Sequence, residues 1–285
     1  VIMKKIIFTL LICLLVNNMF AIKYYVKTTG SSANTGLSWA NAFSSLQTAL
    51  SIAIYGDEIW VAAGQYKTTT SSDRTISFVL KNGVNIYGGF AGTETNINQR
   101  DIANNPTTLN GDIGQPGENT DNTHSIIRAS GITSTIILDG FRIINGYSGI
   151  SYYGGAIHYS ASQNGNLLLR NCYFFSNTSY YYGGAIYLDG ARLSIESCEF
   201  RNNQSVSGGN GGALYGLGAN NGANTLKIKD SKFIGNTSRI GACLANTGSY
   251  RLLEIDKCVF TNNISEYSIL DIEYADTTRI YNSYV

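Results

Sequence analysis

The sequence predicts an all-β chain, folded as a parallel β-helix with three short strands per coil and capped by one N-terminal helix. Two observations support this prediction. A Gly-Gly-Ala-aliphatic motif recurs along the second half of the chain, and a segment that ends in Phe-x-x-Asn follows each copy. The phenylalanines of these segments recur every 26 to 33 residues, at Phe174, Phe200, Phe233 and Phe260. A repeat of this length indicates a solenoid, and apolar residues at alternate positions favour strands over helices.

The first element, residues 1–21, has the pattern of a secretory signal peptide. Lys4 and Lys5 precede an apolar run over residues 6–16, and Ala21 closes a plausible cleavage site. The run is shorter than a membrane span, although a single-helix anchor is the alternative. We therefore expect a mature chain that is secreted or held at the outer cell surface, without a membrane span.

Residues 22–56 are predicted to form an N-terminal cap. Residues 23–30 form an edge strand, and an amphipathic helix follows at about residues 42–54, with Asn41 as its N-cap. Its apolar face consists of Phe43, Leu46, Leu50 and Ile54. Such a helix would cover the hydrophobic end of the first coil, which would otherwise promote aggregation.

Residues 57–285 are predicted to form the β-helix itself. The glycines of the repeated motif stand at a corner where a Cβ would be costly, and the aliphatic residue after them points inward. We expect the inward ladder to consist of Ile157, Ile186, Leu214 and Cys243. A second corner is predicted at Asn177, Asn203, Asn236 and Asn263, whose short side chains tolerate the left-handed conformation and can bond stacked asparagines.

Four residues at equivalent inward positions form a further column, namely Cys172, Cys198, Ser231 and Cys258. Stacked parallel strands offer poor disulfide geometry, so these cysteines are predicted to be small buried core residues. At the end of the chain, residues 277–285 align with residues 192–200 and stop inside a coil. Solenoids need terminal capping units, so the chain is expected to be the N-terminal part of a longer protein.

These motifs resemble those of secreted right-handed, single-stranded parallel β-helix proteins of the pectate-lyase-like fold. The similarity is to the branch with polymorphic outer-membrane protein repeats, which pair Gly-Gly-Ala-Ile with Phe-x-x-Asn. The pair is clearest at residues 183–186 and 200–203. The resemblance spans residues 23–285 and implies a fold that hosts lyases, hydrolases and non-catalytic surface proteins alike.

The candidate chemistry is sparse. A net charge of +1 gives no electrostatic support to a nucleic-acid partner. No cysteine pair has zinc spacing, so we expect no metal site and no cofactor, with calcium left open. On the outward face of the first strand, Asp189 is the one acid and His158 the one base among His158, Tyr187, Tyr215, Leu244 and their neighbours. A glycoside hydrolase needs two carboxylates, so these two residues are catalytic candidates only if the protein is an enzyme.

Tyrosines dominate this face and lead into its strands. We predict a binding strip made of Tyr152, Tyr153, Tyr181, Tyr182, Tyr187 and Tyr215. Exposed aromatic rings suit the C–H faces of sugars and also protein partners, although tyrosine equally covers wet β-surfaces. The leading hypothesis is a non-catalytic, adhesin-like surface protein that binds an extracellular glycan or a surface protein of a host or neighbouring cell. The alternative is a polysaccharide lyase or glycoside hydrolase.

Overall fold

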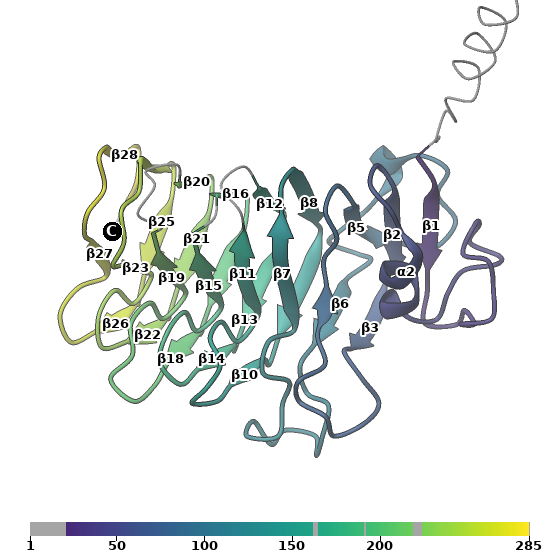
Figure 1. Ribbon diagram of the computed structural model, residues 1–285, viewed down its shortest axis with the longest axis horizontal. Helices are drawn as coiled ribbons and strands as arrows, with labels where there is room; N and C mark the ends of the chain where they lie inside the picture. Colours follow the sequence, from purple (N-terminus) through teal and green to yellow (C-terminus); the bar gives the residue numbers. More distant parts are fainter. Residues whose placement is uncertain (1–20, 162–164, 191, 219–223, 285) are drawn as a thin grey trace, which may run out of the picture.

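The computed structural model describes residues 21–161, 165–190, 192–218 and 224–284. Figure 1 shows a rod in which successive coils stack along the long axis, and every pairing between strands is parallel. The predicted parallel β-helix is therefore confirmed. The predicted signal peptide falls almost entirely outside the described residues. Within them, no helix is long and apolar enough to cross a membrane.

Four sheets run along the rod, and sheet A is the longest with nine strands. In spatial order they are β1 (Lys23–Val26), β2 (Glu58–Ala62), β5 (Asn85–Phe90), β8 (Thr135–Asp139), β12 (Asn166–Arg170), β16 (Arg192–Glu196), β20 (Thr225–Lys229), β24 (Leu252–Asp256) and β28 (Thr278–Tyr281). The strands of this sheet bury alternate residues over most of the rod, as β12, β16 and β20 show. This is the period of two on which the strand prediction depends.

Sheets B and C have seven strands each. Sheet B contains β3 (Gly64–Lys67), β6 (Thr107–Asn110), β9 (Phe141–Ile144), β13 (Tyr173–Phe175), β17 (Glu199–Arg201), β21 (Lys232–Ile234) and β25 (Val259–Thr261). Sheet C contains β4 (Phe78–Val79), β7 (Ile127–Ile132), β11 (Ile157–Ala161), β15 (Ile186–Asp189), β19 (Leu214–Leu217), β23 (Leu244–Asn246) and β27 (Leu270–Ile272). The three strands predicted for each coil of the repeat are therefore the ones that lie in sheets A, B and C.

A fourth sheet, sheet D, adds one strand of two residues to each of five successive coils, beyond the three strands per coil that the sequence predicts. Its members are β10 (Tyr147–Ser148), β14 (Thr178–Ser179), β18 (Gln204–Ser205), β22 (Thr237–Ser238) and β26 (Ile264–Ser265). These strands lie between the asparagine corner and the glycine corner. They are too short for an alternating pattern to reveal them in the sequence.

The glycine corners are confirmed. Gly154, Gly183 and Gly211 have φ angles of 70°, 65° and 70°. A Cβ on Gly183 would lie 2.1 Å from the carbonyl oxygen of Ile186. Both the left-handed backbone and the crowding therefore require glycine at this corner.

The asparagine corner differs from the prediction in one respect. The left-handed residue is the one before each ladder asparagine, as at Ser176 (52°), Asn202 (52°) and Asn262 (55°). The ladder asparagines themselves turn inward, and Asn177, Asn203 and Asn236 are each 0% exposed. The Nδ2 of Asn203 donates to the Oδ1 of Asn236 at 3.0 Å, so the predicted bond between stacked asparagines is confirmed.

Side chains of equivalent positions stack in columns through the core. Phe200 packs between Phe174 and Phe233, with ring centroids 4.6 and 4.8 Å away and nearly parallel planes. The column of Cys172, Cys198, Ser231 and Cys258 is buried, and its cysteines are free, as predicted.

The inward ladder of sheet C needs one correction. Ile186 pairs with Leu214, and Leu214 pairs with Leu244 rather than with Cys243. In that coil the motif reads Gly-Ala-Cys-Leu, so Ala242 replaces the second glycine and Leu244, three residues after Gly241, holds the ladder position. Leu244 therefore faces the core, and Ala245 takes the outward place predicted for Leu244.

The N-terminal helix α2 (Leu46–Ile52) is shorter than predicted. Its N-cap is Ser45, whose hydroxyl accepts from the amide of Gln47, and not Asn41. Leu46 and Leu50 are buried as expected, whereas Ile54 lies beyond the helix end and is 45% exposed. In Figure 1 the helix lies at the N-terminal end of the rod beside β1 and β2. A 3₁₀-helix, η1 (Ile97–Gln99), lies in the connection between β5 and β6.

At the other end of the rod, the predicted alignment of the last segment is confirmed. Thr278 pairs with Leu253 and Ile280 pairs with Ile255. In this alignment Ser283 corresponds to Cys198 and so extends the cysteine column, and its hydroxyl accepts from the amide of Cys258.

Candidate binding surfaces

Four of the six predicted tyrosines form one packed cluster on the outer face of sheet C. The rings of Tyr187 and Tyr215 stack with centroids 5.7 Å apart. Tyr153 covers Tyr187 at 4.8 Å, and Tyr182 covers Tyr215 at 4.5 Å. Tyr187 and Tyr215 are therefore only 7% and 6% exposed. The expectation that they offer open ring faces is wrong, because residues just before the glycine corners fold back over the sheet.

The interior of this tyrosine cluster (Tyr153, Tyr182, Tyr187 and Tyr215) is apolar enough to affect its hydroxyls. Burial, followed by the charge of Asp189, raises the pKa of Tyr187 well above its usual range. Burial likewise raises the pKa of Tyr215, whose hydroxyl lies 2.5 Å from that of Thr247. These phenols stay neutral at any physiological pH, which suits packing rather than proton transfer.

The two catalytic candidates lie on the same sheet face as the cluster. His158 pairs with Arg128 on one side and with Tyr187 on the other, and Asp189 pairs with Ser160. Burial lowers the pKa of His158, and the nearby Arg128 lowers it further while Asp189 opposes the shift. His158 is therefore a neutral imidazole near pH 7. Neither candidate lines either of the two clefts described next.

Tyr152 stands apart from the cluster and lines an open cleft of about 410 Å³, here called the tyrosine cleft. Its ring stacks on the imidazole of His124 with centroids 3.9 Å apart and planes 9° apart. The lining residues are Arg74, Thr120, His124, Tyr147, Gly149, Ile150, Ser151, Tyr152 and Tyr180. The cleft therefore combines aromatic surface, one guanidinium and one imidazole, and Ile150 is 62% exposed.

Hydrogen bonds hold the polar groups of the tyrosine cleft in place. The Nε of Arg74 donates to the carbonyl of Asn122 at 2.6 Å, and Nη2 donates to that of Tyr147 at 2.9 Å. The amide of Gly149 donates to the Nδ1 of His124 at 3.4 Å. Burial, and then the charge of Arg74, lowers the pKa of His124, so this ring is also neutral near pH 7.

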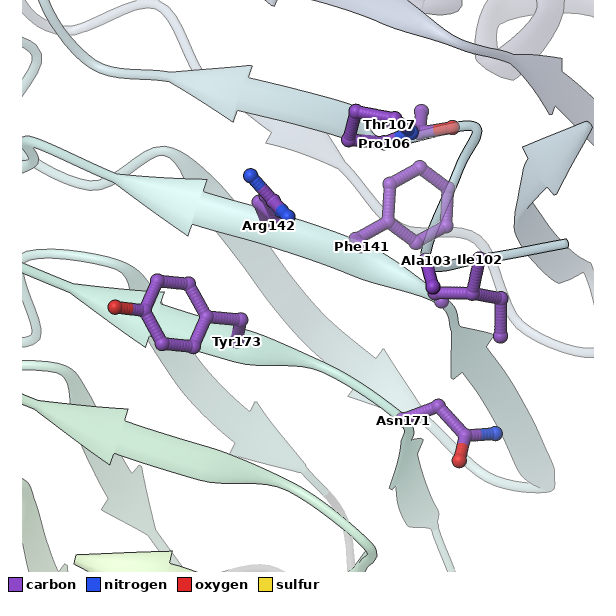
Figure 2. Close-up of a pocket in the computed structure, with 9 residues that line it drawn as sticks. Ile102, Ala103, Pro106, Thr107, Phe141, Arg142, Asn171 and Tyr173 are labelled. Atoms are coloured by element: carbon purple, nitrogen blue, oxygen red, sulfur yellow. The ribbon is translucent and has the colours of Figure 1, made fainter.

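A second cleft of about 470 Å³, here called the loop cleft, opens where the β5–β6 connection passes the N-terminal ends of β6, β9 and β13 in sheet B. Figure 2 shows Arg142 and Tyr173 on neighbouring strands, with Ile102 and Ala103 on the connection opposite them. Thr107, Phe141 and Asn171 complete much of its wall. These residues carry no signal in the sequence, because a 16-residue connection between two strands has no periodic pattern that would place it.

One buried carboxylate lies close to the loop cleft, but its oxygens are occupied. Asp139 is 2% exposed, and its Oδ2 accepts from the Nη2 of Arg100 at 3.0 Å. Its Oδ1 accepts from the Nδ2 of Asn171 at 2.9 Å. The pair anchors the β5–β6 connection onto sheet A, which is a structural role.

The described residues contain no group of three or more His, Cys, Asp or Glu side chains arranged to hold a metal ion. The residues lining the two clefts, all of which lie in the described part of the chain, include no carboxylate. A two-carboxylate hydrolytic mechanism would therefore need acids that line neither cleft.

Comparisons with known proteins address the fold and the repeats. Residues 171–189 and 197–217 match the family model described as the Chlamydia polymorphic membrane protein (Chlamydia_PMP) repeat. No curated protein matches the chain. A match to a solved rhamnogalacturonan lyase covers 92% of this chain and 87% of the lyase chain, with 11% sequence identity and a TM-score of 0.30. This similarity is too low to carry any inference about activity. The resemblance expected from the sequence is thus confirmed at the level of the repeat: the chain is a parallel β-helix protein with repeats of the polymorphic membrane protein type.

Proposed function

We propose that this protein is a non-catalytic, adhesin-like surface protein that binds an extracellular glycan through the tyrosine cleft. The repeat match and the β-helix fit a surface protein with a rigid, rod-like body. The observation that carries the proposal is the stacked pair of His124 and Tyr152 inside an open cleft of about 410 Å³.

The cleft has the two kinds of group that sugar recognition uses. The rings of Tyr152 and Tyr180 present apolar faces to the C–H side of a pyranose, and Ile150 adds exposed apolar surface beside them. The guanidinium of Arg74 and the imidazole of His124 supply polar partners for sugar hydroxyls. Both are already held by backbone contacts, so a ligand would pay little for ordering them.

This proposal revises the predicted binding strip. Of the six tyrosines, Tyr152 lies in the cleft, and Tyr181 lies between Tyr180 and Tyr182, with ring centroids 4.7 and 6.1 Å away. The buried pair of Tyr187 and Tyr215 is proposed to support the surface rather than to touch a ligand.

A glycan array followed by calorimetry with the best ligand tests the proposal. If each ring contributes about 1 kcal/mol, the double variant Tyr152→Ala and Tyr180→Ala loses about 2 kcal/mol, or roughly thirtyfold in affinity. The matched control is Tyr267→Ala, because this ring is 67% exposed but lies on a distant coil. The control is expected to bind like the wild type.

A reducing-end release assay on the same samples separates binding from catalysis. Under the proposal, wild-type protein releases no sugar. Release of reducing ends or of unsaturated products would establish the lyase or hydrolase alternative. Full affinity in the folded double variant would exclude this cleft, and an array without any bound glycan would favour a protein partner.

A further inference from the structure

The connection between β6 and β7 contains a concentration of buried oxygen atoms without hydrogen-bond donors. Among the described residues, eight buried side-chain atoms have no hydrogen-bond partner, and three of them belong to this one connection. They are the Oδ1 atoms of Asp112, Asp121 and Asn122. A buried carboxylate oxygen without a donor costs free energy, and a bound ion is one of the few arrangements that offsets that cost.

The connection folds back on itself, so that its first and last residues lie side by side. The amide of Thr123 donates to the carbonyl of Gly111 at 2.9 Å, which brings the chain just after Gly111 alongside the chain just before Thr123. The backbone at Asp112 thereby lies beside the backbone at Asn122. The amide of Gln115 also donates to the Oδ2 of Asp121 at 2.7 Å, which closes the same loop from the other side.

Each carboxylate accepts from a backbone amide of the loop with its Oδ2, while its Oδ1 accepts no hydrogen bond from the described residues. The Oδ2 of Asp112 accepts from the amide of Gly117 at 3.1 Å, while its Oδ1 lies 3.8 Å from the Nζ of Lys67. Asn122 is only 1% exposed, so bulk water does not reach its side chain. The loop therefore holds two carboxylates and one amide within a stretch of eleven residues, and one of the carboxylates already attracts an ammonium group.

Gly114 shows how closely the loop wraps around the acids. A Cβ at this position would lie 2.2 Å from the Oδ2 and 2.9 Å from the Oδ1 of Asp121. The other cation nearby, Arg74, directs its guanidinium at the carbonyls of Asn122 and Tyr147, and it also interacts electrostatically with Asp121 without forming an ion pair. Among the described residues, Lys67 is the one side chain that forms an ion pair with Asp112 or Asp121. Its Nζ lies 3.8 Å from the Oδ1 of Asp112, which is a long contact.

We propose that this loop binds a calcium ion through the Oδ1 atoms of Asp112, Asp121 and Asn122. The donors are all hard oxygens, which suit Ca²⁺ and exclude a thiolate- or imidazole-seeking metal. Calcium takes six to eight oxygens in flexible geometry, so backbone carbonyls and water would complete the shell, whereas Mg²⁺ demands a stricter octahedron. Two carboxylates indicate a modest dissociation constant, on the order of 10⁻⁴ M.

The test is calorimetric titration of the whole, chelator-treated protein with CaCl₂, together with its melting temperature at each concentration. Binding of one ion and a rise in melting temperature are expected, with at least tenfold weaker binding of Mg²⁺. The double variant Asp112→Asn and Asp121→Asn is expected to lose at least tenfold in calcium affinity. The matched control is Glu118→Gln, which removes one charge from the same loop at an exposed side chain whose carboxylate accepts from Thr120.

Several outcomes would overturn the proposal. No binding by the wild type up to about 10 mM CaCl₂, roughly tenfold above the weakest dissociation constants of protein calcium sites, would refute the calcium site. An equal loss in Glu118→Gln would reduce the effect to general attraction by negative charge. The wild-type titration decides the question even if the double variant does not fold. The site adjoins the tyrosine cleft, because Arg74 donates to the carbonyl of Asn122, but the proposed glycan binding uses different side chains, so the two titrations can fail separately.

Discussion

The asparagine ladder offers the sharpest test of how the repeats hold together, through the substitution Asn203→Ala. Asn203 is fully buried and makes four hydrogen bonds with its side chain. Its Nδ2 donates to the carbonyl of Phe174 and to the Oδ1 of Asn236, each at 3.0 Å. Its Oδ1 accepts from the amide and from the Nδ2 of Asn177, at 3.1 and 3.0 Å. The substitution removes all four bonds and leaves their partners buried.

The expected loss follows from these bonds. A net contribution of about 1 kcal/mol for each bond gives roughly 4 kcal/mol, and the unpaired partners raise this figure rather than lower it. In a solenoid the loss weakens the contacts of one coil with its two neighbours, so the cooperative unfolding transition of the rod should be measurably affected. We therefore expect the denaturation midpoint to fall by the equivalent of about 4 kcal/mol.

Chemical denaturation followed by circular dichroism measures this change. The control is Gln204→Ala, which alters the adjacent exposed residue and is expected to stay within about 0.5 kcal/mol of the wild type. A loss below about 1 kcal/mol for Asn203→Ala, with an unchanged slope, would refute the reasoning. It would mean that water replaces the ladder bonds or that the corner is set by its left-handed residue alone.

Three further predictions concern other parts of the rod. Gly183→Ala should destabilise the fold by well over 1 kcal/mol, because the new Cβ meets the carbonyl of Ile186 at a left-handed corner; wild-type stability in urea would contradict this. His158 should titrate below pH 6.5 by NMR, because burial and a nearby arginine lower its pKa. The unfolded chain then takes up the proton first, so stability is lost as the pH falls below about 6.5, and a titration midpoint above 6.5 would be inconsistent with this environment. Leu46→Asp should detach the cap helix and cause aggregation, because Leu46 is buried. The control Ile52→Asp changes a side chain that is 44% exposed and should remain soluble by size-exclusion chromatography. Equal behaviour of the two variants would argue against a capping role.

The sequence alone determined the architecture, because each coil repeats the same local requirements. A glycine that must adopt positive φ, an alternating apolar pattern and an inward small residue recur at fixed offsets, so Gly183, Ile186, Cys198 and Phe200 could be placed without coordinates. Errors of one residue arose where the repeat is irregular. The motif around Cys243 lacks its second glycine, and at the asparagine corner two adjacent polar residues could each have taken the left-handed conformation.

Only the tertiary structure decided which outward side chains are accessible. Alternation shows that Tyr187 faces away from the core, but its exposure depends on Tyr153, which comes from another coil. Likewise, the stacking of Tyr152 on His124 and the fold-back of the loop at Asp112 join residues whose spacing follows no repeat. The strands obey a local period set by the backbone, whereas these surfaces depend on how connections of unequal length fold over neighbouring coils. That packing is a property of the assembled rod and leaves no periodic trace in the chain.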